Sequence, residues 1–296
     1  MLCGIGLDAV ECLRRLQSIG ATRESKMLRI MNWLRGGGSN RQRCCRPMVE
    51  TLESRTLMST TPAAILLVPA YFYPVAGGGW DQMAAAAKSA PVTAILNPDS
   101  GPGSSADPAY AAAINKLLDH DGHVVAYIHT SYGQRSLAIV KAEVRAYASF
   151  YQLDGFFVDE MATDAADIPY YQHLYAYIKK INRHYEVIGN PGTSTQRSYL
   201  TAPTADVLVD FEDNQSAYPS AAPPSWVRKF RAQQFGNIVG EAASVSAMEA
   251  DLLLAHERNA GYVYVTDQNI NDDNTAYDRL PAYWSQEVAD IKAENG

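Results

Sequence analysis

The stretch Asp154-Gly155-Phe156-Phe157-Val158-Asp159-Glu160 (DGFFVDE, residues 154–160) joins a short apolar run to two adjacent carboxylates. Every residue of the run is apolar, which is typical of a strand buried on both faces in a parallel sheet. Amphipathic stretches of helical length lie on either side, at Ser136–Tyr151 and Ile168–Arg183. The stretch therefore predicts one strand of a sheet in which strands alternate with helices.

The same alternation runs from Ile65 to the end of the chain. The predicted strands are Ile65–Tyr71, Val92–Asn97, His123–His129, Gly155–Asp159, Glu186–Asn190, Asp206–Glu212, Asn237–Glu241 and Gly261–Asp267. The other predicted helices are Trp80–Lys88, Pro108–Asp119, Ser225–Gln234, Val245–Asn259 and Trp284–Ala293. Eight strand–helix units in about 230 residues predict an α/β fold, the (β/α)8 TIM barrel. The rival fold is a doubly wound sheet, but the chain has neither a GxGxxG motif nor a P-loop.

The composition changes near residue 60. Residues 1–60 hold 10 Lys and Arg against 5 Asp and Glu, whereas residues 61–296 hold 15 against 27. We expect residues 1–60 to be a leader of low order and residues 61–296 to be the barrel. All four cysteines lie in the leader, and the adjacent Cys44 and Cys45 have no further ligand pair at the spacing of a zinc site, so we expect no metal and no cofactor.

The leader contains a stretch, Val49–Ser59, that resembles the LEPR-XLL motif found near the N-termini of extracellular proteins in some bacteria. The matching residues are Leu52, Glu53, Arg55 and Leu57. Ser54 and Met58 stand where the motif has proline and leucine. The alternative interpretation is that Val49–Ser59 is a capped helical turn that matches the motif by chance. The resemblance implies export, and we expect a secreted or cell-surface protein.

Charge and hydropathy exclude two classes of partner. The acidic body argues against nucleic-acid binding, which depends on Lys and Arg that neutralise phosphates. The longest apolar stretch, residues 63–76, is too short for a membrane span and contains Pro69 and Pro74. The acidity is compatible with a neutral or cationic substrate, although it also serves solubility.

Polar and aromatic side chains collect where the predicted strands end, which is where barrel enzymes place their active sites. These residues are Tyr71, Tyr73, Asn97, His129, Tyr132, Asp159, Glu160, Asn190, Glu212, Glu241, Asp267 and Gln268. Trp80, Tyr218 and Trp226 lie in or near the loops that follow strands and are further candidates for sugar-stacking platforms. Each single ring has packing as its alternative role, and His129 has a structural hydrogen bond as its alternative.

The orientation of Glu212 follows from alternation along its strand. Strict alternation puts Val207, Val209 and Phe211 on one face and Leu208, Asp210 and Glu212 on the other. We expect the apolar face to pack on the outer helices, so that Glu212 points to the barrel axis. Alternation gives no orientation for Asp159 or Glu160, and Asp159 has helix capping as its alternative role.

Paired carboxylates favour glycosidic-bond cleavage, which needs one protonated and one ionised carboxyl group. Two adjacent carboxylates repel, which raises one pKa toward the value that a general acid needs. The chain has no GxSxG elbow, and His256-Glu257 lacks the second histidine of a zincin.

At these residues the chain resembles the spherulin-4-like family. The motifs that carry the resemblance are VPAYFYP (68–74), ILNPDSGPG (95–103), AYIHTSYG (126–133), DGFFVDE (154–160), NPGT (190–193), Phe211-Glu212 and YDRLPAYW (277–284). The resemblance implies an endo-acting TIM-barrel glycoside hydrolase that cuts α-1,4-linked N-acetylgalactosamine, without a cofactor. It also implies catalytic roles for Asp159, Glu160 and Glu212.

Within that resemblance, we expect Glu160 to be the general acid, Glu212 the nucleophile or base, and Asp159 a group that tunes Glu160 or positions the sugar. The reverse order of the two glutamates stays open. The expected substrate-binding residues are Tyr71, Tyr73, Asn97, His129, Tyr132, Asn190 and Asp267. The alternative function is a non-catalytic carbohydrate-binding or spore-coat protein on the same barrel.

Overall fold

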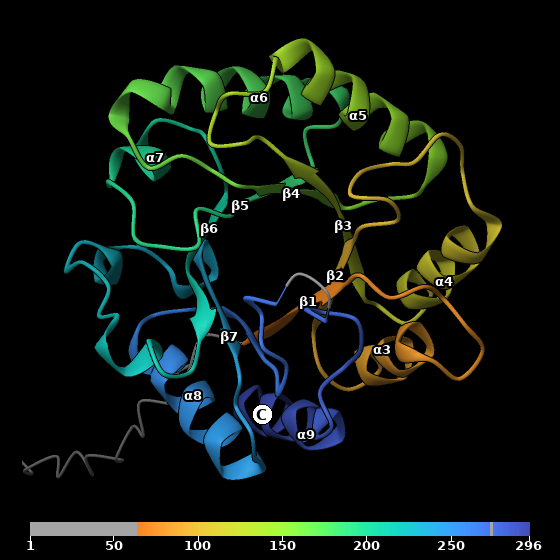
Figure 1. Ribbon diagram of the computed structural model, residues 1–296, viewed down its shortest axis with the longest axis vertical. Coiled ribbons are helices and arrows are strands. Elements are labelled where there is room, and N and C mark those ends of the chain that lie inside the picture. Colours follow the sequence, from red (N-terminus) through yellow and green to blue (C-terminus); the bar gives the residue numbers. More distant parts are fainter. Residues whose placement is uncertain (1–63, 273–274) are drawn as a thin grey trace, which may run out of the picture. The chain divides into compact units, whose positions relative to one another are not determined.

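The structure is a computed structural model that describes residues 64–272 and 275–296. Eight parallel strands close into a barrel in chain order, from β1 to β8 (Figure 1). Their bounds are Ile65–Ala70, Val92–Leu96, His123–His129, Gly155–Asp159, Glu186–Gly189, Val207–Asn214, Phe235–Gly240 and Tyr262–Val265. The (β/α)8 prediction is confirmed, and each predicted strand matches an observed one. The predicted leader, residues 1–60, lies outside the described residues.

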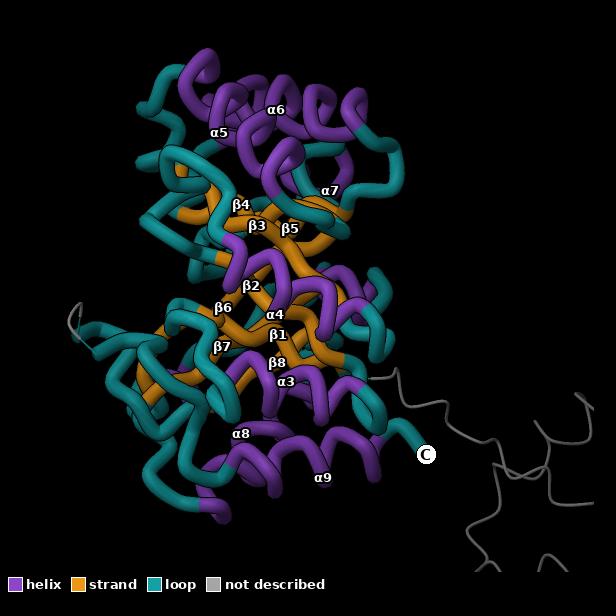
Figure 2. The backbone as a smooth tube through the Cα atoms, turned by 90° about the vertical axis from the view of Figure 1, so that its right-hand side faces the viewer, coloured by secondary structure: helices purple, strands orange, loops and turns teal. Residues whose placement is uncertain are grey.

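Helices surround the barrel, as the side view in Figure 2 shows. They are α3 (Gly79–Ala87), α4 (Pro108–Leu118), α5 (Leu137–Phe150), α6 (Ile168–Ile181), α7 (Ser198–Thr201), α8 (Val245–Glu257) and α9 (Trp284–Glu294). Local sequence explains several starts. The side chain of Asp107 accepts from Ala109 N at the start of α4, where Pro108 follows, and Ser136 and Ser244 cap α5 and α8 in the same way.

The predicted helix over Ser225–Gln234 is wrong. This segment forms only two 3₁₀ turns, Val227–Lys229 and Ala232–Gln234. Tertiary contacts replace the helix: the rings of Trp226 and Phe230 pack edge-on with centroids 5.7 Å apart, and both contact Phe235 on β7. The side chain of Asn259 donates to the carbonyls of Val227 and Phe230, which an α-helix would have satisfied internally.

The core lies inside the barrel and between the strands and the helices. Its largest fully buried side chains include Trp80, Tyr147, Tyr171, Phe156 and Phe235. The barrel is irregular at β6, where the pairing with β7 shifts between Val209 and Phe211. Such a bulge adds one residue to a strand and redirects the side chains that follow it.

Candidate active site

The candidate site is built at the carboxyl ends of β4, β5 and β6. Asp159 is the last residue of β4, and Glu160 follows it with φ of +49°. A positive φ is uncommon for a residue other than glycine and costs energy. The turn is held by Thr130 and Tyr132, which donate to the Glu160 carbonyl at 2.8 and 2.7 Å. This left-handed turn lets the two adjacent carboxylates diverge.

Asn190, which follows β5, joins Asp159 to Glu212. Its side-chain Nδ2 donates to Asp159 Oδ1 at 2.7 Å and to Glu212 Oε2 at 2.5 Å. Asn190 is itself buried and is fixed on its other side, because its Oδ1 accepts from Gly192 N at 3.0 Å. One buried amide, bonded on both sides, therefore sets the spacing of two carboxylates that come from β4 and β6.

Glu212 is held at both oxygens. Tyr277 Oη donates to Glu212 Oε1 at 2.6 Å, while Oε2 accepts from Asn190. Burial raises the pKa of Glu212 to about 7, the nearby charge of Asp159 adds to the rise, and the bonds from Tyr277 and Asn190 oppose it. Burial also raises the pKa of Asp159, against hydrogen bonds from Tyr127 and Asn190. The pair therefore holds a proton more tightly than exposed carboxylates do.

Glu160 belongs to a different set of contacts. Its Oε2 accepts from Ser131 N at 3.0 Å and lies 3.2 Å from His129 Nδ1. The Glu160 side chain is 39% exposed, whereas Glu212 lies deeper in the barrel. Glu160 is thus a rim carboxylate that is oriented by β3 and the loop after it.

Aromatic rings form the wall beside the pair. The ring of Tyr71 packs edge-on against Tyr127 and Tyr277, with centroids 5.6 and 5.5 Å apart. The ring of Tyr127 in turn stacks on the imidazole of His129. A continuous aromatic wall thus reaches from β1 across β3 to the loop after β8.

The sequence of this barrel matches the model of spherulation-specific family 4 over residues 65–291. The chain belongs to this family. Spherulin-4 from Physarum polycephalum is 36% identical over 240 residues, which cover 78% of this chain and 70% of that protein.

Solved structures that resemble this family member include glycoside hydrolases. One is α-L-fucosidase isoenzyme 2 from Paenibacillus thiaminolyticus, with a TM-score of 0.50, 11% identity, and coverage of 79% of this chain and 49% of that one. This chain thus spans about half the length of that fucosidase. Another is the cyclic α-maltosyl-(1→6)-maltose hydrolase from Arthrobacter globiformis bound to its cyclic sugar, with a TM-score of 0.50, 8% identity, and coverage of 80% and 82%. At these identities the likeness shows a shared fold.

The bulge in β6 corrects the reasoning about Glu212 in this family member. Glu212 contacts Asn190 and Tyr277, but strict alternation would have turned Asp210 the same way. Instead Asp210 Oδ1 accepts from Asn237 Nδ2 at 2.7 Å and lies near the charge of Arg258, while Phe211 packs on Tyr218. The expected apolar face of Val207, Val209 and Phe211 is therefore wrong, because the bulge between Val209 and Phe211 breaks the alternation.

Several residues expected to bind substrate lie near the carboxylates, and others do not contact them. Tyr71, His129 and Asn190 belong to the contacts just described. Tyr132 lies on the rim with its side chain largely exposed. Tyr73 donates to Asp107 at 3.1 Å, Asn97 Oδ1 accepts from Gly101 N, and Asp267 pairs with Arg279 at 2.7 Å. Among the rings considered as platforms, Trp80 and Tyr218 are core residues.

Sequence reasoning missed Tyr277 and Tyr127 as parts of the site. Tyr277 lies in the YDRLPAYW motif but is not near a strand end, and it has φ of +61°. Tyr127 lies inside β3, two residues before its end. Positive φ outside glycine recurs around this mouth, at Ser131, Tyr132, Glu160 and Glu241. Such strain commonly marks functional sites, but it is invisible in a sequence.

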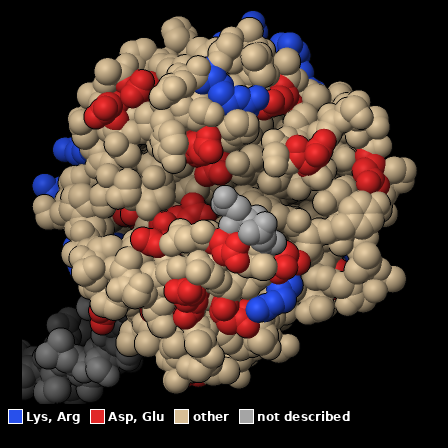
Figure 3. Space-filling view, in the orientation of Figure 1, with Lys and Arg blue, Asp and Glu red and all other residues tan. Residues whose placement is uncertain are grey.

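The surface around the site is acidic. In Figure 3, Asp and Glu side chains gather around the centre of the face onto which the barrel opens, and Lys and Arg lie mostly toward its margin. The rim cation Arg279 is paired with Asp267, and Arg135 is paired with Glu143 at 2.5 Å. The face therefore suits a neutral or cationic ligand.

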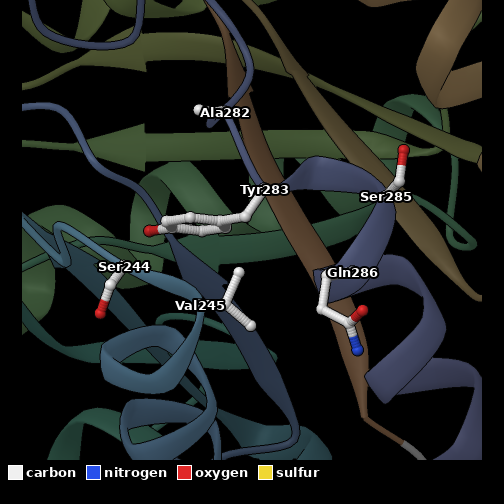
Figure 4. A pocket seen from close by; sticks show the side chains of 6 residues that line it. All are labelled: Ser244, Val245, Ala282, Tyr283, Ser285 and Gln286. Atoms are coloured by element: carbon white, nitrogen blue, oxygen red, sulfur yellow. The ribbon is translucent and has the colours of Figure 1, made fainter.

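A cavity of about 470 Å³ lies apart from the carboxylates, between the starts of α8 and α9 (Figure 4). It is lined by Ser244, Val245, Ala282, Tyr283, Ser285 and Gln286. This lining has no carboxylate, imidazole or cation.

Within residues 64–272 and 275–296, no three His, Cys, Asp or Glu side chains lie close enough together to hold a metal ion. Within the same ranges, no helix combines the length and the apolar character that a bilayer crossing requires.

Proposed function

We propose that this chain is a glycoside hydrolase, endo-acting on α-1,4-linked N-acetylgalactosamine or a related amino-sugar polysaccharide. The observation that carries the proposal is the Asp159–Glu212 pair held on the single amide of Asn190, at 2.7 and 2.5 Å. A site that only binds sugars gains nothing from burying two mutually repelling carboxylates, since burial of charge is costly. A hydrolase needs such a pair.

The spacing of the pair supports a retaining mechanism. Asp159 Oδ1 and Glu212 Oε2 both accept from Asn190 Nδ2, so the distance between these two oxygens cannot exceed the sum of the two hydrogen-bond lengths. For this pair of oxygens, the limit lies nearer to the separation of about 5–5.5 Å between the carboxyl groups of retaining glycosidases than to the 6.5–9.5 Å of inverting ones.

Glu212 is the proposed general acid and base, and Asp159 the proposed nucleophile. Burial raises the pKa of Glu212 toward neutrality, so this group can give and take a proton close to neutral pH, and its second oxygen is held by Tyr277 rather than by Asn190. The Asp159 carboxylate attacks the anomeric carbon while Glu212 protonates the departing glycosidic oxygen. Water, deprotonated by Glu212, then attacks the same carbon and releases Asp159. This order differs from the expectation that Glu160 is the acid.

Glu160 then serves as a sugar-binding carboxylate on the rim. Ser131 N and His129 orient its side chain, which is more exposed than that of Glu212. An exposed, oriented carboxylate accepts hydrogen bonds from sugar hydroxyl or amide groups. This role places Glu160 in contact with substrate without making it the proton donor.

The linkage proposed for the substrate fits a protein that supplies both groups. In an α-linked 2-acetamido sugar, the acetamido group lies on the same side as the leaving oxygen. It cannot attack the anomeric carbon from the opposite side, so assistance by the substrate is excluded by geometry. The wall of Tyr71, Tyr127 and Tyr277 supports the proposal further, because apolar sugar faces stack on aromatic rings.

The direct test is to incubate the full chain with a panel of amino-sugar polysaccharides and to measure new reducing ends. We expect oligosaccharides from an α-1,4-linked N-acetylgalactosamine polymer, with the α configuration retained in the first product seen by NMR. The control is the Glu212→Gln variant, which should release none above background. Tight binding of a polymer without any new reducing ends would instead support the non-catalytic alternative.

A further inference from the structure

A second cavity lies at the opposite end of the barrel, where the strands begin. Its volume is about 350 Å³, and its polar lining includes His123, Asp154, Asn182, His184, Glu186 and Tyr262. Glu186 is the first residue of β5, His123 the first of β3 and Tyr262 the first of β8. Residues at this end of a TIM barrel usually contribute to stability and not to catalysis. A cavity lined by several ionisable side chains at this end therefore needs a separate explanation.

Glu186 lines this cavity and bonds to a residue across the barrel. Tyr262 Oη reaches it across the barrel and donates at 2.9 Å to Oε2, with Oε1 at 3.1 Å. One hydroxyl proton uses only one of the roughly four acceptor positions of a carboxylate. Burial raises the pKa of Glu186, which records the cost of keeping the charge there. The cavity is the side from which the remaining positions can be satisfied.

The wall of the cavity is anchored by Asp154. Its Oδ2 accepts from Val124 N at 2.8 Å and lies 3.5 Å from His123 Nδ1. The hydrogen bond to Asp154 raises the pKa of His123, and the charges of Glu186 and Asp121 add to the rise. The imidazole is nevertheless 61% exposed, so it stays accessible to a ligand.

Lys179 acts on the charge of Glu186 from nearby but forms its bonds elsewhere. Lys179 donates to Asp206 at 2.6 Å and to the carbonyl of Tyr185 at 2.5 Å, so its charge is balanced locally. Of the cationic groups nearby, His123 pairs with Asp154, Lys179 is shared with Asp206, and the exposed Arg183 donates to His184. Glu186 has no cation bonded to it, so its charge favours a cationic ligand. The exposed His184 and Asn182 at its edge add groups that can bond to hydroxyls.

We propose that this amino-end cavity is a second binding site, for a single unacetylated amino sugar. The ammonium group would be held by Glu186 and Asp154, and the ring hydroxyls by His123, His184 and Asn182. A volume near the lower limit of small-molecule pockets, about 300 Å³, suits one sugar ring rather than a chain. The site is separate from the hydrolytic pair and does not depend on the proposed hydrolase activity.

The first experiment titrates galactosamine into the Glu212→Gln protein, in which the catalytic pair is disabled, and follows binding by calorimetry. We expect one site per chain, with N-acetylgalactosamine and galactose each at least about 10-fold weaker, because neither carries the ammonium charge that the carboxylates would bind. Adding Glu186→Gln should lower galactosamine affinity by the same factor. Equal affinity for the three sugars, no binding, or no effect of Glu186→Gln would overturn the proposal.

A second measurement needs no variant at the cavity and so does not depend on its folding. The imidazole signals of the six histidines are followed by NMR during galactosamine titration of the unmodified chain. The signals of His123 and His184 should shift together along one binding curve. A shift confined to His129, at the other end of the barrel, would assign the sugar to the hydrolytic mouth and reject the second site. Because the probe is a monosaccharide, neither result depends on whether the protein cleaves polysaccharides.

Discussion

The hydroxyl of Tyr277 donates to Glu212 Oε1 at 2.6 Å, although the two residues are 65 positions apart in the chain. Tyr277 comes from the loop after β8 and Glu212 from β6, so the bond links two sides of the barrel mouth. The same loop is tied at its base, where the Gln268 side chain donates to Asp278 and to the carbonyl of Thr275. The state of Glu212 therefore depends on the position of this loop.

Tyr277→Phe should change both the rate and its pH dependence. The Tyr277 bond lowers the pKa of Glu212, so its loss raises that pKa. Because Glu212 must be protonated to act as the acid, the alkaline limb of the rate profile should move to higher pH. The rate should fall about 10-fold or more, because a hydrogen bond to a charged group contributes enough free energy to change a rate by that factor. A profile of kcat/KM against pH tests this, and an unmoved alkaline limb would separate Tyr277 from the titration of Glu212.

Substitutions of the three carboxylates should distinguish their roles. Asp159→Asn and Glu212→Gln should each lower kcat by about 10²–10⁴-fold, since each removes a reacting group. Glu160→Gln should raise KM more than it lowers kcat. All three variants should still fold cooperatively, because an amide has the shape of the carboxylate that it replaces. If Glu160→Gln loses as much kcat as the others and keeps KM, the proton donor is Glu160.

The fold could be predicted because each barrel strand carries its own local signal. Short β-branched runs separated by amphipathic stretches fixed all eight strands and most helices. The segment Ser225–Gln234 failed because tertiary contacts of Trp226, Phe230 and Asn259 override its local preference. No local pattern records such contacts.

The site could be predicted only as a set of strand ends. That rule found Asp159, Asn190 and Glu212, whose side chains do contact one another. It could not find Tyr277, which reaches Glu212 from a long loop. Strict alternation wrongly grouped Asp210 with Glu212, because a bulge adds one residue to β6. Loop paths and bulges arise from the packing of the whole barrel, so the sequence of a single strand does not predict them.

Gly155→Ala should be strongly destabilising. Strand β4 passes so close to β5 that an added Cβ would lie 2.0 Å from the backbone oxygen of Glu186. The strands would have to separate, and we expect a loss of at least about 4 kcal/mol in the free energy of unfolding, or no folded protein. Gly77→Ala is the matched control, because its Cβ would meet nothing within 4 Å and would cost only about 1–3 kcal/mol for its positive φ. Chemical denaturation of both variants makes the comparison, and equal losses would contradict the close approach.

Export remains a prediction of the sequence alone. We expect the protein to be found outside the cytosol of its native host, with the segment around Leu52–Ser59 acting as the sorting signal. Fractionation followed by mass spectrometry of the mature N-terminus tests this. A variant without residues 1–60 should stay in the cytosol. Recovery of the full chain only from cytosol would rule out the leader role.

Glu287 on α9 should make the barrel less stable as the pH rises. The side chain is completely buried, its Oε1 accepts from Val265 N at 2.9 Å, and burial raises its pKa to about 8, with Asp290 adding to the rise. Val265 lies past the short pairing between β1 and β8, which joins only Ile65 to Tyr262 and Leu66 to Val263. Glu287 thus supplies an acceptor that β1 does not provide there.

The sign follows from proton binding in the two states. Between the ordinary pKa of a glutamate, 4.5, and the folded value of about 8, the folded chain holds a proton on Glu287 that the unfolded chain has released. Stability from this group is complete below the lower value and is lost as the pH rises through the upper one.

Glu287→Gln keeps the acceptor for Val265 N but cannot ionise. Its melting temperature should therefore fall less than that of the parent between about pH 5 and pH 9, an interval that spans most of the titration of Glu287. At pH 9 the variant should melt at least about 2 °C above the parent, since each kcal/mol is worth about 2–4 °C in a domain of this size. Calorimetry at both pH values measures the difference, and parallel curves would show that Glu287 does not titrate in this range. Glu249→Gln, on the outer surface of α8, is the control for a charge change alone and should leave the slope as it is in the parent.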